Sequence, residues 1–276
     1  TGGGEDLYAT AYGIVPGTVD MSKMNALLTE ASTKHKTIRF NDGEYIFPQT
    51  INVPSDVSII GNTKTVFKAS ATSVNPLMKI YKADNVYLSH LIIQGTNSSK
   101  PSSSAGTQVG LWVGYSKAVN IENVEVVGWN KHGFYATHMS SNADQQPYQF
   151  FKHLQISNCR FYHNHTGAYL DFRCEYTQMV NCIFGGNYIG SVNCGGNNCY
   201  SSSQWNANTI GFIVDGGTYG TTGSNPAHAS CSACVFNHNT QIAIQVDKAV
   251  HGWAFTGCQI FYGKIKLNQT KNIIFS

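Results

Sequence analysis

Short segments of alternating apolar and polar residues recur along most of the chain, each with an Asn or Gly near its middle. Residues 119–126, 154–161 and 178–184 align on one pattern, in which an Asn separates two short apolar and polar runs. Residues 85–93 and 253–261 extend the pattern to both sides. The repeat is about 22 to 24 residues long, and longer intervals are expected where insertions loop out of a coil.

These segments predict short β-strands, because alternation is the period of a strand and no helical segment separates them. A unit of this length cannot bury its own apolar face, so it has to stack on its neighbours. A parallel β-helix meets this need, since each strand then bonds to the coil above and the coil below. The sequence therefore predicts an all-β fold, a right-handed parallel β-helix whose equivalent residues stack about 4.8 Å apart.

One helix is expected, near the start of the chain, with Asp20 or Ser22 as its N-cap. Its apolar stripe at helical spacing consists of Met21, Met24, Leu27, Leu28 and Ala31. A helix here would cover the open end of the first coil, where an exposed edge invites pairing. We expect an N-terminal segment with this capping helix over residues 1–36, and a single β-helix domain over residues 37–276.

The two ends of the sequence suggest a piece of a longer protein. Thr1-Gly2-Gly3-Gly4 is neither a signal peptide nor a natural initiator, so we expect a processed or shortened chain. Residues 271–276 predict a strand up to the last residue, with no cap after it. We therefore expect the natural protein to continue.

Charges are few and scattered, which limits the possible partners. Charged residues make up 12% of the 276 residues, with 18 Lys and Arg against 15 Asp and Glu. Because no basic block is present, no nucleic-acid partner is expected. No stretch reaches the roughly 18 apolar residues of a membrane span, so no membrane insertion is expected. The chain has no G-x-G-x-x-G turn and no phosphate-binding loop, so no cofactor is expected.

Four of the eight cysteines, Cys159, Cys182, Cys234 and Cys258, occupy the same place in successive repeats. We expect them to stack as small buried hydrophobic residues and not to pair. Cys194 and Cys199 could close a small loop, which the sequence leaves open. No cysteine pair has the partner ligands of a zinc site, so no metal is expected. Reduced thiols would fit folding in a reducing cytosol.

The N-terminal part of the chain resembles a known family. Residues 11–14 (Ala-Tyr-Gly-Ile), the helix, and the segments 37–47 and 57–61 are similar to the start of the pectate-lyase-like superfamily, and within it to phage tailspike and tail-appendage polysaccharide depolymerases. The resemblance implies a parallel β-helix, a homotrimer and a polysaccharide substrate or receptor. The polygalacturonase motifs and the Trp-Ile-Asp-His pattern of pectate lyases are absent, with Lys131-His132-Gly133 only a fragment of the former. Pectin cleavage is therefore not expected.

A second strand follows each Asn-containing strand. These second strands start at Gly110, Gly133, Gly167, Gly190 and Gly211. Alternation directs two sets of residues inward: Leu111, Phe134, Ala168 and Phe212, together with Val113, Ala136, Leu170 and Val214. Trp112, Tyr135 and Tyr169 then point outward in a row. Exposed rings of this kind suit the apolar faces of sugars, but a neighbouring loop or a trimer partner could cover them as well.

The same alternation, continued past Tyr169, places Asp171, Arg173 and Glu175 on the outer face. His163 and His165 lie in the preceding turn. Acidic, basic and cationic side chains are thus expected to lie close together on one short stretch. This is notable because the chain has only 15 acidic residues. The competing interpretation is a surface ion-pair strip of little energetic value.

Distances favour one mechanism over another. Asp215 is expected in the column of Asp171, with Cys194 on the coil between them, so the two acids lie about 9.6 Å apart. This is the upper edge of the separation suited to hydrolysis with inversion, and Glu175 could substitute for either acid. A lyase would instead use Arg173 as a carboxylate clamp and His163, His165 or Tyr169 as the base. The chain has no basic concentration to attract an acidic polymer, so the lyase ranks second.

We therefore expect a tailspike-type protein that binds, and hydrolyses, a bacterial cell-surface or extracellular polysaccharide. Substrate would be bound by Trp112, Tyr135, Tyr169, Arg173, His163 and His165. The protein would act on the virion tail, after folding in the host cytoplasm, or outside the cell. A lyase, a non-catalytic receptor-binding module and a structural fibre remain alternatives. The other histidines, among them His132, His228 and His251, are interpreted as polar loop residues, and Asp247 as solvent-exposed.

Overall fold

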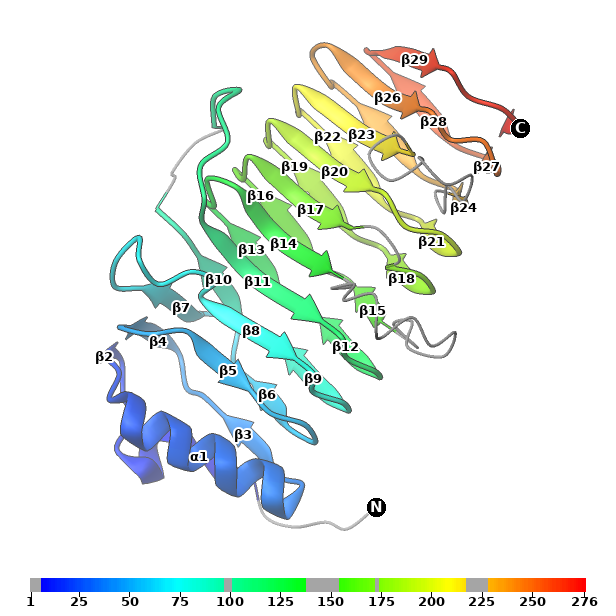
Figure 1. The fold of residues 1–276 in the computed structure, drawn as a ribbon. Coiled ribbons are helices and arrows are strands. Elements are labelled where there is room, and N and C mark those ends of the chain that lie inside the picture. Colours follow the sequence, from blue (N-terminus) through cyan, green and yellow to red (C-terminus); the bar gives the residue numbers. More distant parts are fainter. Residues whose placement is uncertain (1–5, 97–100, 138–153, 172–173, 217–227) are drawn as a thin grey trace.

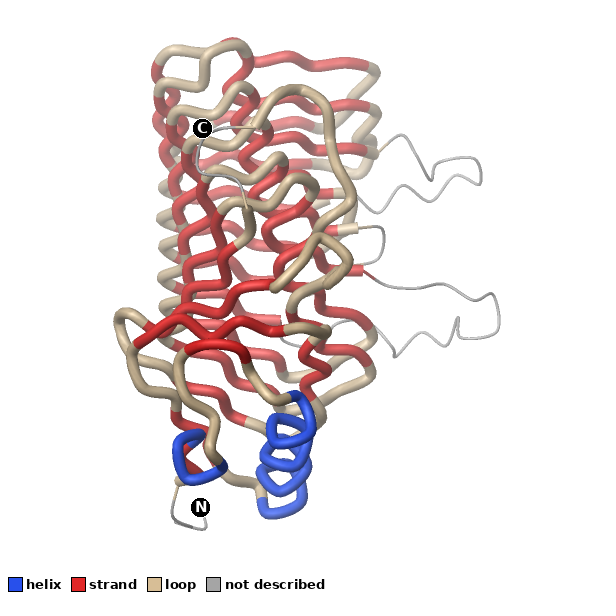
Figure 2. Tube along the Cα trace, turned by 90° about the vertical axis from the view of Figure 1, so that its left-hand side faces the viewer, coloured by secondary structure: helices blue, strands red, loops and turns tan. Residues whose placement is uncertain are grey.

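The computed structural model describes residues 6–96, 101–137, 154–171, 174–216 and 228–276. In these residues short strands wind around a common axis and form three parallel sheets, with one α-helix at the N-terminal end (Figure 1). Figure 2 shows the coils stacked on one another along that axis. The predicted all-β, right-handed parallel β-helix is confirmed.

Each complete coil contributes one strand to each sheet, whereas the first lacks a strand in sheet C and the last has only β30. Sheet A contains β1 (Leu7–Tyr8), β3 (Thr37–Arg39), β6 (Ser58–Ile60), β9 (Val86–Ser89), β12 (Val119–Glu122), β15 (Leu154–Ser157), β18 (Thr177–Val180), β21 (Asn198–Ser201), β24 (Ala229–Ser232), β27 (Trp253–Thr256) and β30 (Ile273–Phe275). Sheet B contains β2 (Gly17–Thr18), β4 (Gly43–Phe47), β7 (Thr65–Ala69), β10 (Ile92–Gln94), β13 (Glu125–Val127), β16 (Arg160–Tyr162), β19 (Ile183–Gly185), β22 (Gln204–Asn206), β25 (Val235–Asn237) and β28 (Gln259–Phe261). Sheet C contains β5 (Ile51–Val53), β8 (Met78–Tyr81), β11 (Val109–Gly114), β14 (His132–Thr137), β17 (Thr166–Leu170), β20 (Ile189–Asn193), β23 (Ile210–Asp215), β26 (Ile242–Asp247) and β29 (Lys264–Asn268).

The repeated Asn marks the turn from sheet A to sheet B. Asn123, Asn158 and Asn181 have φ values of 53°, 55° and 52°, in the left-handed region that Asn tolerates better than most residues. The residue after this Asn points inward. The predicted cysteine stack occupies this place and is confirmed: Cys159, Cys182 and Cys234 are fully buried and Cys258 is half-buried. All eight cysteines, including Cys194 and Cys199, are free thiols.

A stack of buried asparagines lies inside the turn from sheet B to sheet C. Its members are Asn164, Asn187, Asn208 and Asn239. The side-chain oxygen of Asn187 accepts a hydrogen bond from the Asn164 backbone N–H (2.9 Å), and its side-chain nitrogen donates to the Phe161 carbonyl (2.9 Å). The other members repeat this arrangement. The asparagine stack therefore satisfies buried backbone groups and links one coil to the next.

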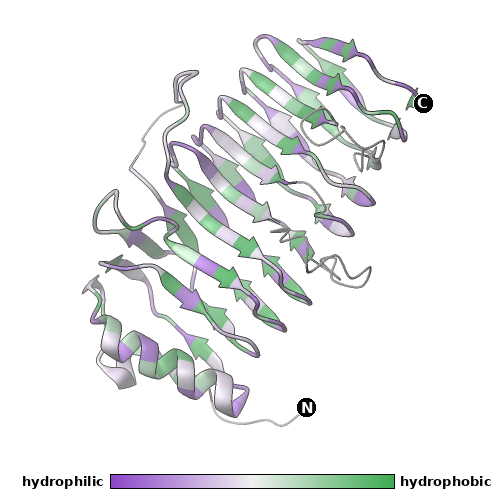
Figure 3. Ribbon diagram, viewed as in Figure 1, coloured by the Kyte–Doolittle hydropathy of each residue, from purple (hydrophilic) through white to green (hydrophobic). Residues whose placement is uncertain are grey.

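The glycines that open the sheet C strands are required by close contact between coils. A side-chain carbon on Gly167 would clash with the backbone carbonyl of Gly190, and one on Gly190 would clash with the carbonyl of Gly211. The inward sets predicted for these strands are confirmed. Leu111, Phe134, Ala168 and Phe212 are fully buried, as are Val113, Ala136, Leu170 and Val214. Figure 3 shows the corresponding alternation of hydrophobic and hydrophilic positions along the strands.

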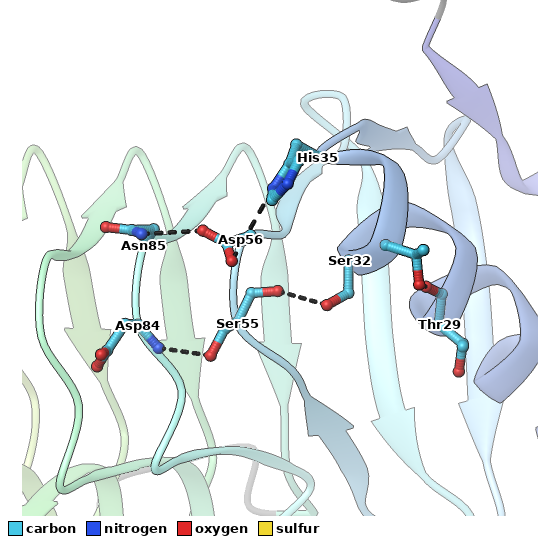
Figure 4. Close-up of polar contacts among 8 residues, drawn as sticks. Thr29, Ser32, His35, Ser55, Asp56, Asp84 and Asn85 are labelled. Atoms are coloured by element: carbon cyan, nitrogen blue, oxygen red, sulfur yellow. Dashed lines mark hydrogen bonds and ion pairs between the residues drawn. The ribbon is translucent and has the colours of Figure 1, made fainter.

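The single helix, α1 (Met21–Lys34), closes the N-terminal end of the stack (Figure 1). Asp20 is its N-cap and accepts a hydrogen bond of 2.9 Å from the Ser22 N–H, and the five residues of the predicted apolar stripe are buried. Ser32 Oγ donates to the Ser55 carbonyl (2.8 Å), and Ser55 Oγ accepts from the Asp84 N–H (2.9 Å), which ties the helix to the first coils (Figure 4).

The sheets begin ahead of this helix. β1 and β2 precede α1 and pair with β3 and β4, and a 3₁₀ turn (Ala9–Tyr12) lies between them. Among the described residues, no helix has the length and apolar character needed to cross a membrane.

Candidate functional site

The predicted row of aromatic residues lies on the outer face of sheet C. Trp112, Tyr135 and Tyr169 occupy equivalent positions of β11, β14 and β17, and all three are half-buried. The rings of Trp112 and Tyr135 are nearly parallel, with centroids 6.4 Å apart, whereas Tyr169 meets Tyr135 edge-on at 5.7 Å. We call these three residues the aromatic row.

The row continues toward the N-terminal end through residues that the sequence did not single out. Tyr81 lies 5.7 Å from Trp112 and 5.8 Å from Tyr115 between ring centroids. Lys79 Nζ stands 4.6 Å from the Trp112 ring centroid, and Lys82 Nζ stands 5.7 Å from that of Tyr81. The ammonium groups of these two lysines make cation–π contacts with the rings and place positive charge at this end of the row.

His132 lies in the middle of the row, and its interpretation as a polar loop residue is wrong. It is the first residue of β14 and only 9% exposed, with its ring centroid 5.2 Å from Tyr135 and 4.8 Å from Tyr169. Its buried Nδ1 has no hydrogen-bond partner in the part of the chain that the structure describes. Burial, and to a lesser extent the charges of Lys131 and His165, lower the pKa of His132 to about 3. The imidazole is therefore neutral at physiological pH.

The two predicted histidines occupy different surroundings. His165 is buried, with Nε2 3.2 Å from the Ser103 carbonyl oxygen, to which it donates, and its ring packs on Tyr188 at 5.2 Å. Burial lowers the pKa of His165, which the hydrogen bond to Ser103 partly offsets. His163 lies at the corner after β16, where its ring meets Tyr162 of sheet B at 6.4 Å. His165 therefore acts electrostatically on His132, whereas the ring contact of His163 is with sheet B.

Asp171 follows directly on β17 and is held by the row itself. Its Oδ2 accepts hydrogen bonds from the Tyr135 phenol (2.9 Å) and from Thr137 Oγ1 (3.3 Å). Burial raises the pKa of Tyr135, and the negative charge of Asp171 raises it further, so the phenol stays a donor. The backbone carbonyl of Asp171 accepts a bond of 3.0 Å from the Cys174 N–H, which turns the chain at this point.

β17 is shorter than expected and does not reach Glu175, but the expected directions hold, since Cys174 is buried and Glu175 is half-buried. β17 ends at Leu170, and Glu175 lies in the turn before β18. Its Oε2 accepts a hydrogen bond of 3.2 Å from Asn197 Nδ2. Arg173, predicted as a cation between the two acids, lies outside the described residues. The described structure therefore gives Asp171 and Glu175 separate hydrogen-bond partners.

The predicted register of Asp215 is confirmed. Leu170, Asn193 and Val214 are in register on successive strands, so the residues that follow them, Asp171, Cys194 and Asp215, form one column. Val214 is fully buried and Asp215 half-buried, as expected for an outward carboxylate. Two strand spacings separate the two acids by about 9.6 Å.

Cys194 lies between the two acids in this column. The Cys194 thiol contacts the Tyr169 hydroxyl at 3.5 Å. Burial raises the pKa of Cys194 to about 12, and the charges of Asp215 and Asp171 act in the same direction. Asp247, interpreted as an isolated exposed acid, is in register with Asp215 and continues the column on the next strand. Among the described residues, no group of three or more His, Cys, Asp or Glu side chains is arranged to hold a metal ion.

No protein-family model matches the chain, and no curated protein sequence matches it. Several solved structures, by contrast, match the fold of the chain. ORF18 of Geobacillus virus E2 superposes with a TM-score of 0.68 at 12% identity, over 98% of this chain and 61% of its own. The tailspike protein gp49 of the Acinetobacter baumannii bacteriophage Fri1, a capsular polysaccharide depolymerase, gives 0.64 at 12% identity, over 100% and 58%. The A-module of the Azotobacter vinelandii mannuronan C-5 epimerase AlgE4 gives 0.56 at 12% identity, over 98% and 97%.

The chain thus spans about three fifths of the length of the two phage proteins. At such low identity the similarity establishes the fold. The expected parallel β-helix is the fold that this chain shares with the phage tailspike gp49 and with ORF18.

Proposed function

We propose that this chain is a tailspike-type protein that binds a bacterial surface polysaccharide along the outer face of sheet C and hydrolyses it with Asp171 and Asp215. One observation carries the proposal: the aromatic row leads directly to an acid, because Tyr135 belongs to the row and also donates its phenol hydrogen to Asp171. A sugar chain lying along the row would therefore reach the carboxylate.

The row supports binding through rings on successive coils. Sugar rings present apolar C–H faces that pack on aromatic side chains, and the phenol hydroxyls add hydrogen bonds. Because the rings repeat along the axis of the stack, they suit an extended polymer. We place the protein on the virion tail, since the similar structures include a phage tailspike that is a capsular polysaccharide depolymerase.

The spacing of the acids supports inversion. Tyr135 and Thr137 are donors that need an acceptor, which suits Asp171 to be the carboxylate that removes a proton from water. That water attacks the anomeric carbon as Asp215 gives its proton to the leaving oxygen, and the glycosidic bond breaks. A separation of about 9.6 Å leaves room for the water between acid and sugar. Glu175 takes no part, since its carboxylate is held by Asn197.

The test is product release from a panel of bacterial surface polysaccharides, with reducing ends and unsaturated-sugar absorbance followed together. We expect reducing ends without absorbance, and a loss of about 10²- to 10⁴-fold in Asp171→Asn and in Asp215→Asn. Glu175→Gln is the matched control and keeps its activity.

Three outcomes would contradict the proposal. Absorbance of unsaturated sugar would establish a lyase. Binding without cleavage by the unmodified protein would establish a receptor-binding module. Unchanged cleavage by both Asp variants would move the chemistry to other residues.

A further inference from the structure

A pocket of about 620 Å³ lies at the amino ends of four strands of sheet A, where the chain arrives from sheet C. It is lined by parts of β21, β24, β27 and β30 and of the turns that precede them. None of its lining residues belongs to the aromatic row or to the column of Asp171 and Asp215. The volume falls in the usual range of small-molecule sites.

The lining combines small apolar residues with polar groups. Ala229, Gly252 and Ala254 carry little or no side chain, which leaves the space open, and Ile274 adds an apolar surface that is 58% exposed. Polar groups come from Asn197, Asn198, His228, Ser230, His251 and Asn272. Among the described residues that line the pocket there is no Lys, Arg, Asp or Glu. A neutral ligand with both apolar and hydroxyl-bearing surfaces fits this lining.

A chain of hydrogen bonds fixes the orientation of His228. Asn197 Nδ2 donates to the Glu175 carboxylate (3.2 Å), so Asn197 Oδ1 faces His228 Nε2 at 3.1 Å. An amide oxygen only accepts, so Nε2 must carry the hydrogen. With the hydrogen on Nε2, Nδ1 is an acceptor, and it is buried with no hydrogen-bond partner among the described residues. A buried acceptor of this kind beside a pocket is a group that a ligand hydroxyl or an ordered water can satisfy.

His251 completes the polar side of the pocket. Its ring is exposed and meets that of His228 edge-on, with centroids 6.3 Å apart. Asn272 donates its side-chain nitrogen to the Val250 carbonyl (3.3 Å), and Ser230 Oγ lies 3.9 Å from the Cys199 sulfur. The pocket thus offers an oriented acceptor, hydroxyl and imidazole groups beside apolar surface.

We propose that this pocket is a second carbohydrate site, which binds a single neutral sugar unit independently of the outer face of sheet C. Sugar hydroxyls would donate to His228 and exchange hydrogen bonds with Ser230 and His251. The apolar C–H groups of the sugar would lie against Ala229, Ala254 and Ile274. This site goes beyond the proposed depolymerase function, since none of the residues assigned to catalysis contributes to it.

The half-buried thiol of Cys199, which lines the pocket, gives a direct test. Alkylation of Cys199 by iodoacetamide is timed with and without the methyl glycosides of glucose, galactose, mannose and N-acetylglucosamine. We expect at least one glycoside to slow alkylation, by about threefold at twice its dissociation constant. The same glycoside should shift the ring resonances of His228 and His251 in NMR spectra.

Two variants separate this site from the polysaccharide face. His228→Ala should abolish protection while Cys199 still reacts, and Trp112→Ala should leave protection unchanged. The proposal is overturned if all four glycosides leave both the alkylation rate and the two resonances unaltered. Stronger protection by glucuronate than by the glucoside would overturn the neutral class of ligand. Loss of protection in Trp112→Ala would show that the sugar binds on sheet C instead.

Discussion

The phenol of Tyr135 donates a hydrogen bond of 2.9 Å to the carboxylate of Asp171, a residue 36 positions further along the chain. The two residues come from neighbouring coils, so the contact exists only because the strands stack in register. It joins the surface suited to sugar rings to the carboxylate suited to catalysis.

Removing this hydrogen bond should impair cleavage without removing the acid. Tyr135→Phe keeps the ring in the row but leaves Asp171 with one donor fewer. A hydrogen bond to a charged group contributes about 1.5–3 kcal/mol, so kcat/KM on the cleaved polysaccharide should fall by about 10- to 100-fold. Tyr162→Phe, on the outer face of sheet B, is the control and should cleave normally. Equal rates for both variants would separate Tyr135 from the chemistry.

His132 should make the fold sensitive to acid. Its pKa is about 3 in the folded protein and 6.5 in its ordinary state, so between these values the unfolded chain binds a proton that the folded chain excludes. Stability should therefore fall as the pH drops below about 6.5, by up to about 1.4 kcal/mol per pH unit from this residue. Urea unfolding at pH 7 and pH 5 measures the difference.

The matching variants are His132→Gln and His251→Gln. The first replaces the buried imidazole and should flatten the dependence on pH, whereas the second replaces an exposed one and should not. A steep dependence that persists in His132→Gln would mean that another group excludes the proton.

Cys199 should be the thiol that reacts in the folded protein. Burial raises the pKa of Cys182 and Cys194 to about 12, which leaves little reactive thiolate. Cys199 is half-buried and lines an open pocket. Titration with a chromogenic disulfide should release about one equivalent per folded chain, and almost none from Cys199→Ser. Several equivalents from the folded protein would show that the cysteine stack is open to solvent.

The asparagine stack should carry a large share of local stability. Asn187→Ala would leave the Asn164 N–H and the Phe161 carbonyl without side-chain partners in a buried site. Each such group costs about 1–3 kcal/mol, so the free energy of unfolding should fall by about 3 kcal/mol. Gln178→Ala, an exposed change on β18, should stay within about 0.5 kcal/mol in the same urea titration. Similar midpoints for the two variants would contradict this role.

The fold followed from the sequence where local rules decide the structure. The inward positions of Leu111 and Phe134 depend only on alternation along a strand, and the place of Cys159 depends on a turn that repeats unchanged. The outward column of Asp171 and Asp215 followed from the same reasoning, since the strands before both residues keep their register.

The remaining features depend on contacts that no short segment encodes. His132 pairs with Val109 and Thr166 on the neighbouring strands, and its ring lies against those of Tyr135 and Tyr169. Glu175 lies beyond the end of β17, and its hydrogen bond to Asn197 joins residues that are 22 positions apart. The pocket brings together Asn197 and His228, which are 31 residues apart. Asn164, Asn187, Asn208 and Asn239 follow one another at 23, 21 and 31 residues, so no fixed period revealed them.

The unequal spacing within the asparagine stack also bears on how a β-helix of this kind can become longer or shorter. The side chain of each asparagine in the stack accepts a hydrogen bond from the coil before it and donates one to that same coil, so any coil can follow any other that presents the same groups. Deleting a few residues from a turn would set an asparagine against a partner of the wrong kind. Deleting a whole coil would bring Asn164 onto Asn208 with every bond restored. The molecule can therefore lengthen or shorten in whole coils, as a stack of interchangeable units, while its outward side chains remain free to diverge.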